Sequence, residues 1–328
     1  TNRMVYMSDQ FCEKAWETWL GKLAPSEMEG STDRIEVEYL LRPFILRQGG
    51  TILHAPPKRG KSFMGLLMAQ SINCGVAILW PVTRAKTLFI NLERSKEELT
   101  KRLGDVNEIL GLERREPLLT LNARGRRLSY VIEAAAKSIE EHLVDFVVVD
   151  SLSRTGYGSL TANDDANAAM DDLNALCPSW LTLAHSPRGD ESHVFGSQMF
   201  DAAADVLVRL VTQQQKEKLG IGLSITQAND TGDRALYVYE LSFDSAGLRG
   251  ARRAKLGDFP ELAAGRQKSI ADEIYDFLLE QGKSTATEFS HASGRNRGYV
   301  NEILRGDKRF IMLGKDGKEM LYGIQDGA

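Results

Sequence analysis

Residues 55–62 have the composition and spacing of a loop that binds phosphate. Their sequence, Ala-Pro-Pro-Lys-Arg-Gly-Lys-Ser, matches the pattern G-x-x-x-x-G-K-[ST] at every defined position except the first, where Ala55 replaces glycine. In such a loop the backbone N–H groups surround the phosphate, Lys61 contacts the outer phosphates and the Ser62 hydroxyl binds Mg²⁺. A left-handed backbone at Ala55 would cost about 1 kcal/mol relative to glycine. The alternative is that Gly-Lys-Ser simply opens a surface helix.

The prediction covers the loop and the residue that follows it. The expected nucleotide-binding residues are Ala55, Pro56, Pro57, Lys58, Arg59, Gly60, Lys61, Ser62 and Phe63.

Carboxylates follow two later apolar runs. Asp150 ends the run 143–150, where a carboxylate would hold Mg²⁺ through water; alternatively, it is a turn residue. Glu93 follows the run 87–92 and would polarise the attacking water; alternatively, it starts the next helix. His185 ends a third run and is placed to contact the γ-phosphate, although a lone histidine is often structural.

The elements that must position these residues alternate between strand and helix from about residue 36 to 245. The expected strands are 51–55, 87–92, 146–150, 181–185, 206–211, 223–226 and 236–243, and the expected helices are 62–74, 95–110, 128–143 and 161–177. Alternation of this kind predicts an α/β fold with a mostly parallel sheet. Short turns separate the later strands, which predicts that the sheet finishes with antiparallel strands. Ser95 and Glu98 form a capping-box pattern at the start of one helix.

The ends of the chain differ from this central pattern. Residues 1–33 contain an amphipathic helix, Ser8–Leu23, and a linker, and this helix would pack on its own core or on a neighbouring subunit. The α/β core is expected over 34–249 and a second linker over 250–268. Residues 269–328 predict three short helices and a β-hairpin, which is the pattern of a winged helix.

Composition limits the class of protein. The chain has 328 residues, 42% hydrophobic and 26% charged, with a formal net charge of −4, which excludes a uniformly basic coat for nucleic acid. Three widely spaced cysteines suggest neither a disulfide framework nor a zinc site. No apolar run has the length of a membrane helix, and we expect a cytoplasmic protein.

The ordered set of motifs resembles the RecA-fold ATPases of the RepA type. The resemblance rests on Trp80-Pro81-Val82, Leu88–Glu93, Val149–Arg154, Ala184-His185-Ser186, Gly196-Ser197 and Ala203-Ala204-Asp205. These ATPases are hexameric replicative helicases and their relatives from plasmids, phages and mobile elements, related to the DnaB helicases. The resemblance implies a homo-oligomeric ring that binds ATP and Mg²⁺ between subunits.

The same resemblance implies a role for each motif residue. Lys61 and Ser62 would bind phosphate and Mg²⁺, Glu93 would be the catalytic base, Asp150 the Walker B acid and His185 the phosphate sensor. The arginine finger has no unambiguous match, and Arg209 and Arg234 are the candidates. The chain also departs from related proteins just after the sensor, where it has Ser186-Pro187-Arg188.

Contact with DNA has two candidate locations. Single-stranded DNA would pass loops at 154–167 and 187–198, which carry acids as well as bases and support a processive helicase only weakly. Duplex DNA would contact the winged helix through Arg295, Arg297, Tyr299 and Lys308. Two alternatives to a helicase stay open: an ATP-gated DNA-binding or loader assembly without unwinding, and a protein-remodelling or defence-associated switch whose winged helix is a protein adaptor.

Overall fold

The structure of the protein is a computed structural model. It describes residues 2–22, 25, 27–31, 33, 36–154, 158–187, 193–229, 233, 235–265, 270–293, 296–317 and 319–325. Within the chain, Thr1–Val37 and Glu38–Ala328 are separate compact units.

The first unit consists mainly of helix α1 (Asn2–Lys22). It begins six residues before the predicted Ser8, so the sequence pattern underestimated its length. Phe11 and Leu20 are exposed on this helix, and its expected docking site stays a prediction.

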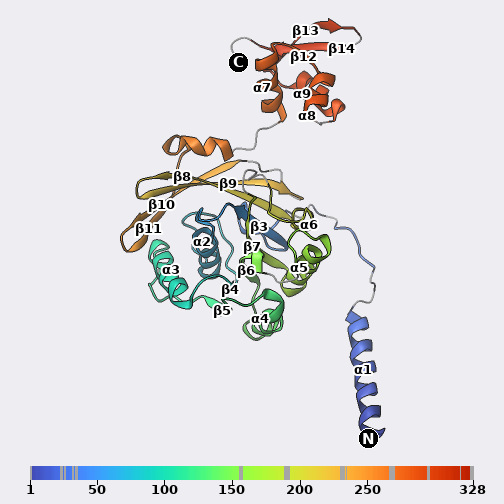
Figure 1. The fold of residues 1–328 in the computed structure, drawn as a ribbon, viewed down its shortest axis with the longest axis vertical. Helices are drawn as coiled ribbons and strands as arrows, with labels where there is room; N and C mark the ends of the chain where they lie inside the picture. The colour runs from blue at the N-terminus through green and yellow to red at the C-terminus, as the bar shows by residue number, and fades with distance from the viewer. Residues whose placement is uncertain are drawn as a thin grey trace. The chain divides into compact units, whose positions relative to one another are not determined.

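The second unit is built on a large sheet of nine strands among the described residues (Figure 1). In chain order these are β3 (Gly49–Ala55), β4 (Thr87–Asn91), β5 (Leu119–Asn122), β6 (Phe146–Asp150), β7 (Ser179–His185), β8 (Val206–Gln215), β9 (Lys218–Ala228), β10 (Leu236–Asp244) and β11 (Gly247–Arg253). Their spatial order is β11-β10-β9-β8-β3-β7-β6-β4-β5. Neighbouring strands are parallel in the part β8-β3-β7-β6-β4-β5. They are antiparallel in the part β11-β10-β9-β8. Both expectations for the sheet are therefore confirmed.

Helices cover both faces of the parallel part (Figure 1). α2 (Lys61–Cys74) and α3 (Lys96–Ile109) lie on one face, and α4 (Leu128–His142) and α5 (Asn163–Leu176) lie on the other, followed by the short α6 (Met199–Ala203). Every residue of β4 and β6 is buried, as expected for strands covered on both sides. A Cβ on Gly65 of α2 would come within 2.9 Å of Leu183 in β7. Glycine at this position therefore lets α2 approach the sheet closely.

One of the two hydrogen bonds of the capping box predicted for α3 is present. The Ser95 side chain accepts a hydrogen bond from the Glu98 backbone N–H, at 3.1 Å. The Glu98 carboxylate contacts Arg94 and Arg102 instead, each at 2.7 Å.

The linker predicted at 250–268 is wrong for most of its length. Residues up to Arg253 belong to β11, and the 3₁₀ helices Leu256–Asp258 and Pro260–Gly265 follow. Phe259 and Leu262 are each only 1% exposed, and they form a small apolar cluster with Val238 of β10. The basic, non-periodic composition concealed these two buried side chains. The folded core consequently continues to residue 265 rather than ending at 249.

The C-terminal elements form a small helix and sheet unit around their own apolar cluster. They are α7 (Ile270–Gln281), β12 (Ser284–Thr285), α8 (Ala286–Ser293), α9 (Arg297–Gly306), β13 (Phe310–Asp316) and β14 (Glu319–Ile324). The strands form an antiparallel sheet in the order β12-β14-β13. Ile274, Phe289 and Val300 are among the buried side chains that join these helices.

The remaining strands, β1 (Tyr39–Leu41) and β2 (Ile45–Leu46), pair with each other before β3. In the part of the chain that the structure describes, none of the helices has both the length and the apolar character needed to cross a membrane.

Candidate active site

The loop between β3 and α2 has the geometry of a phosphate cradle. Its backbone adopts left-handed conformations at Lys58 (φ 64°) and Gly60 (φ 80°). Ala55 ends β3 and is not among the residues with positive φ. The concern about a missing glycine at the first motif position is therefore wrong: alanine is unstrained there, and the left-handed residues come later in the loop.

Lys61 lies at the start of α2 with its ammonium group directed back into the loop. Its Nζ donates hydrogen bonds to the backbone oxygens of Ala55 (2.7 Å) and Pro56 (2.9 Å), and it lies 3.2 Å from His185 Nδ1. Burial lowers the pKa of Lys61 to about 8, and Asp150 and Glu93 oppose this shift. A partly desolvated ammonium in this position is well suited to binding an anion.

Asp150 ends β6, the strand that follows β7 in the sheet order. Burial raises the pKa of this carboxyl to about 6, and the nearby Glu93 carboxylate adds to the shift, whereas Ser62 and Arg94 oppose it. Its Oδ2 is buried and has no hydrogen-bond partner among the described residues. An oxygen in that condition fits a cation, because a positive charge would compensate for its lost hydration.

Ser62 and Asp150 together offer the hard oxygen donors that Mg²⁺ prefers. The described residues contain no group of three or more His, Cys, Asp or Glu side chains able to hold a metal. Two protein oxygens suffice for Mg²⁺ at a phosphate site, since water and phosphate complete its coordination. These residues therefore fit the ion that a P-loop requires.

Glu93 follows β4 and is oriented by two hydroxyl groups. Ser151 Oγ and Ser153 Oγ (3.3 Å) both donate to Glu93 Oε1. No hydrogen bond to Oε2 is found among the described residues, which leaves that oxygen able to accept a proton from water. A general base needs such an oxygen, and this role of Glu93 stays a prediction.

His185 ends β7, the strand between β3 and β6. Burial lowers the pKa of His185, and the Lys61 ammonium lowers it further. A neutral imidazole beside Lys61 would contact a phosphate oxygen as a hydrogen-bonding group without adding a charge.

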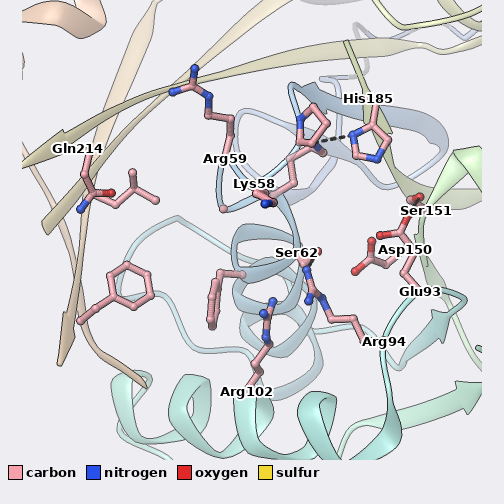
Figure 2. A pocket seen from close by; sticks show the side chains of 16 residues that line it. Lys58, Arg59, Ser62, Glu93, Arg94, Arg102, Asp150, Ser151, His185 and Gln214 are labelled. Carbon is pink, nitrogen blue, oxygen red and sulfur yellow. Dashed lines mark hydrogen bonds between the residues drawn. The ribbon is translucent and has the colours of Figure 1, made fainter. Parts of the chain in front are cut away.

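These residues line one cavity of about 570 Å³ (Figure 2). Lys58, Arg59, Gly60, Lys61, Ser62 and Phe63 of the loop, together with Glu93, Asp150 and His185, all contribute to its wall. Pro57 also lines it, whereas Ala55 and Pro56 contribute the carbonyls that hold Lys61.

The two arginine-finger candidates lie elsewhere. Arg209 is in β8, opposite His54 of β3, and does not line the cavity. Arg234 falls outside the described residues, as do Arg188 and Arg295.

Sequence reasoning missed several residues that line the cavity. Arg94 approaches the Ser62 hydroxyl at 3.4 Å, and Ser151 holds Glu93. Arg94 and Ser151 directly follow predicted site residues, so neighbourhood in sequence was an available signal. Arg102, Gln214, Leu219 and Phe243 also line the cavity. They are remote in sequence and belong to no motif, so only the fold reveals them.

Comparison with known proteins agrees with this geometry. Residues 22–185 match the AAA domain family, and this segment covers half of the chain. No curated protein matches the chain. The matched segment includes the phosphate loop, Glu93 and Asp150, and it ends at His185. The chain belongs to the AAA domain family, and its core is that of a RecA-like P-loop ATPase.

Proposed function

We propose that this ATPase assembles into a ring and acts as a motor on DNA, most closely resembling the RepA-type hexameric replicative helicases. The observation that carries the proposal is the placement of Glu93, Asp150 and His185 at the ends of three adjacent strands around one cavity. Hydrolysis in this arrangement proceeds with Glu93 taking a proton from water and Lys61 stabilising charge on the phosphates. Mg²⁺, bound by Ser62 and Asp150, would supply further charge neutralisation.

An arginine finger supplied by a neighbouring subunit would fit a ring in which ATP binds between subunits. The described cavity-lining arginines, Arg59, Arg94 and Arg102, are engaged with Thr212, Ser62 and Glu98 of the same chain. A finger from a neighbouring subunit would lie outside its own cavity, as Arg209 does. Arg209 and Arg234 stay the candidates for this role.

The loops proposed to face a DNA strand are joined at their bases. Ser197 donates a backbone hydrogen bond to Leu160 O and a side-chain hydrogen bond to Asn163 Oδ1, each at 2.7 Å. Residues 187–198 begin directly after His185 and Ser186. The Phe195 backbone N–H also donates a hydrogen bond to the His185 carbonyl oxygen at 2.7 Å, so a change at the proposed phosphate sensor would reach both loops through hydrogen-bonded contacts.

The C-terminal unit is proposed to be a winged helix that contacts duplex DNA. The order of its helices and strands is that of the motif. Tyr299, Arg305 and Lys308 are exposed, whereas Arg297 forms an ion pair with Glu319 at 3.1 Å. The available basic surface therefore centres on Arg305 and Lys308 more than on Arg297.

A strand-displacement experiment tests the helicase. The full chain should separate a forked DNA duplex with ATP, and it should fail without ATP or with Lys61→Ala. Lys61→Ala should also abolish ATP turnover, because the group that contacts the phosphates is lost; intact turnover would refute the phosphate-loop role of Lys61.

Other outcomes favour the alternatives. Oligomers that hydrolyse ATP and bind DNA but open no duplex would favour an ATP-gated DNA-binding or loader assembly. Hydrolysis that single-stranded DNA does not stimulate would favour a protein-remodelling or defence-associated switch.

A further inference from the structure

The cavity has a second end that the phosphate chemistry does not use. Asp150, Ser151 and His185 lie at one side of the cavity, and Gln214 lies at the other, with the phosphate loop between them (Figure 2). Leu219 pairs with Gln214 between β9 and β8, and the Phe243 backbone N–H donates to the Glu217 carbonyl in the turn between these two strands, at 2.8 Å. Phe63, whose ring contacts that of Phe243, lines the cavity with them. A nucleotide with its terminal phosphate near Glu93 would direct its base toward Gln214.

The second end has an apolar wall with an aromatic pair. The rings of Phe63 and Phe243 pack edge to face, with centroids 5.6 Å apart and an interplanar angle of 69°. The Arg102 guanidinium lies over the Phe63 ring, 4.4 Å from its centroid. Leu219 packs beside Gly60, where an added Cβ would lie 3.2 Å from its side chain. Apolar and aromatic walls of this kind bind flat heterocycles by stacking and burial.

Gln214 gives this apolar wall a polar group of fixed orientation. Its Nε2 donates hydrogen bonds to the backbone oxygens of Lys216 (2.7 Å) and Lys218 (3.1 Å). Only the nitrogen of an amide donates to carbonyls, so these two contacts determine which way the group points. In Figure 2 the amide oxygen lies on the side of the group that points toward the phosphate loop, and the nitrogen lies on the other side. The second end therefore presents a hydrogen-bond acceptor.

We propose that Phe63, Phe243 and Leu219 form a nucleobase subsite in which the Gln214 oxygen selects a purine with a 6-amino group over one with a 6-oxo group. An amino group donates to this oxygen, whereas a 6-oxo group would place a second acceptor against it. The inference rests on the ATPase assignment and adds the means by which adenine is distinguished. Three of the four residues lie beyond the part of the chain that matches the AAA domain.

The test is direct binding of nucleotides to the full chain by isothermal titration calorimetry, with ATP, inosine triphosphate and inorganic tripolyphosphate as probes. Wild type should bind ATP about tenfold or more tightly than inosine triphosphate, because one base hydrogen bond is lost. Gln214→Leu should bind the two nucleotides equally. Gln215→Leu, an adjacent change in a side chain that does not line the cavity, should keep the wild-type preference.

A separate variant tests the aromatic wall. Phe243→Ala should lower the affinity for both nucleotides by about tenfold or more, because stacking on the base is lost. The affinity for tripolyphosphate should not change. Equal wild-type affinity for ATP and inosine triphosphate would overturn the proposal, and so would a preference that survives in Gln214→Leu.

The design separates this inference from the ATPase assignment. If both nucleotides bind equally and Lys61→Ala abolishes their binding, the phosphate site stands and the base subsite fails. If wild type binds neither nucleotide, both fail.

Discussion

Several side chains around the cavity are held in one orientation by hydrogen bonds to neighbouring groups. Glu93 is the clearest example, because two serine hydroxyls fix one of its carboxylate oxygens. Lys61 is similarly held by two backbone oxygens, and Gln214 by two others. Orientation at each position is provided by a neighbour rather than by the functional residue itself.

Glu93→Gln should retain nucleotide binding but lower the hydrolysis rate by about 10²-fold or more, because an amide cannot accept the proton of water. The serine hydroxyls still have an amide oxygen to bind, so the fold should be preserved. Hydrolysis and nucleotide binding are measured in parallel. Glu97→Gln, on the exposed first turn of α3, is the matched control. Loss of binding by a normally folded Glu93→Gln would make Glu93 structural.

His54 should make the folded protein sensitive to acid. Burial, with Arg209, lowers the pKa of His54 to about 4, from 6.5 when unfolded. Between these values the unfolded chain binds more protons, so stability falls as the pH falls from 6.5 to 4. The shift corresponds to about 3 kcal/mol of unfolding free energy, lost fully only below pH 4.

Urea unfolding of wild type and His54→Asn across this pH range checks that expectation. Asp150, whose pKa is raised, acts in the opposite sense but is common to both proteins, so it cancels in their difference. The difference in unfolding free energy should narrow as the pH falls. His142→Asn, at an exposed histidine, should show the same pH dependence of unfolding free energy as wild type. If the unfolding free energies of wild type and His54→Asn differ by the same amount at every pH, His54 is not the source of the acid sensitivity.

At the level of elements, periodicity predicted the parallel core well. Strands such as 146–150 are continuous apolar runs whose burial follows from their composition, and their terminal polar residues indicated which edge carries the site. The edge strand β5 was missed, since Leu119–Asn122 is short and only partly buried. The end of the core was misjudged because Phe259 and Leu262 stand in a basic, irregular segment.

Phe259→Ala should destabilise the core. A Cβ on Gly220 would come within 2.3 Å of the Phe259 ring, so the ring packs directly on the backbone of β9. Removing a buried phenylalanine costs about 3–5 kcal/mol. Urea unfolding should show that loss, whereas Glu261→Ala, at an exposed neighbour, should change stability little. A normal midpoint for Phe259→Ala would mean that this segment contributes nothing to the fold.

For the whole molecule, sequence reasoning identified the order of parts but not the full cavity. Motif residues are recognisable because phosphate chemistry restricts their types and spacing. The base end uses Gln214, Leu219 and Phe243, residues of ordinary type that come together only when β8, β9 and β10 pair. No local pattern could reveal them.

The proposed DNA contact of the C-terminal unit has a charge test. Lys308→Glu should weaken binding of the full chain to duplex DNA and reduce the salt dependence of the logarithm of affinity by about 1, as for a lost phosphate contact. Basal ATP hydrolysis without DNA should not change. Lys283→Glu makes the same charge change at another exposed lysine of the unit. Equal effects of both variants would indicate nonspecific electrostatics, and no effect of Lys308→Glu would remove Lys308 from the contact.

The antiparallel strands β8–β11 also decide how short a working fragment can be. The family resemblance ends at His185, yet one wall of the cavity comes from residues 214–243, and Phe259 and Leu262 pack beneath those strands. A fragment cut after the last motif would keep every residue predicted to bind phosphate but would expose the edge of β3 where β8 pairs. Such an edge invites aggregation. Expression boundaries for this ATPase should therefore be placed after residue 265.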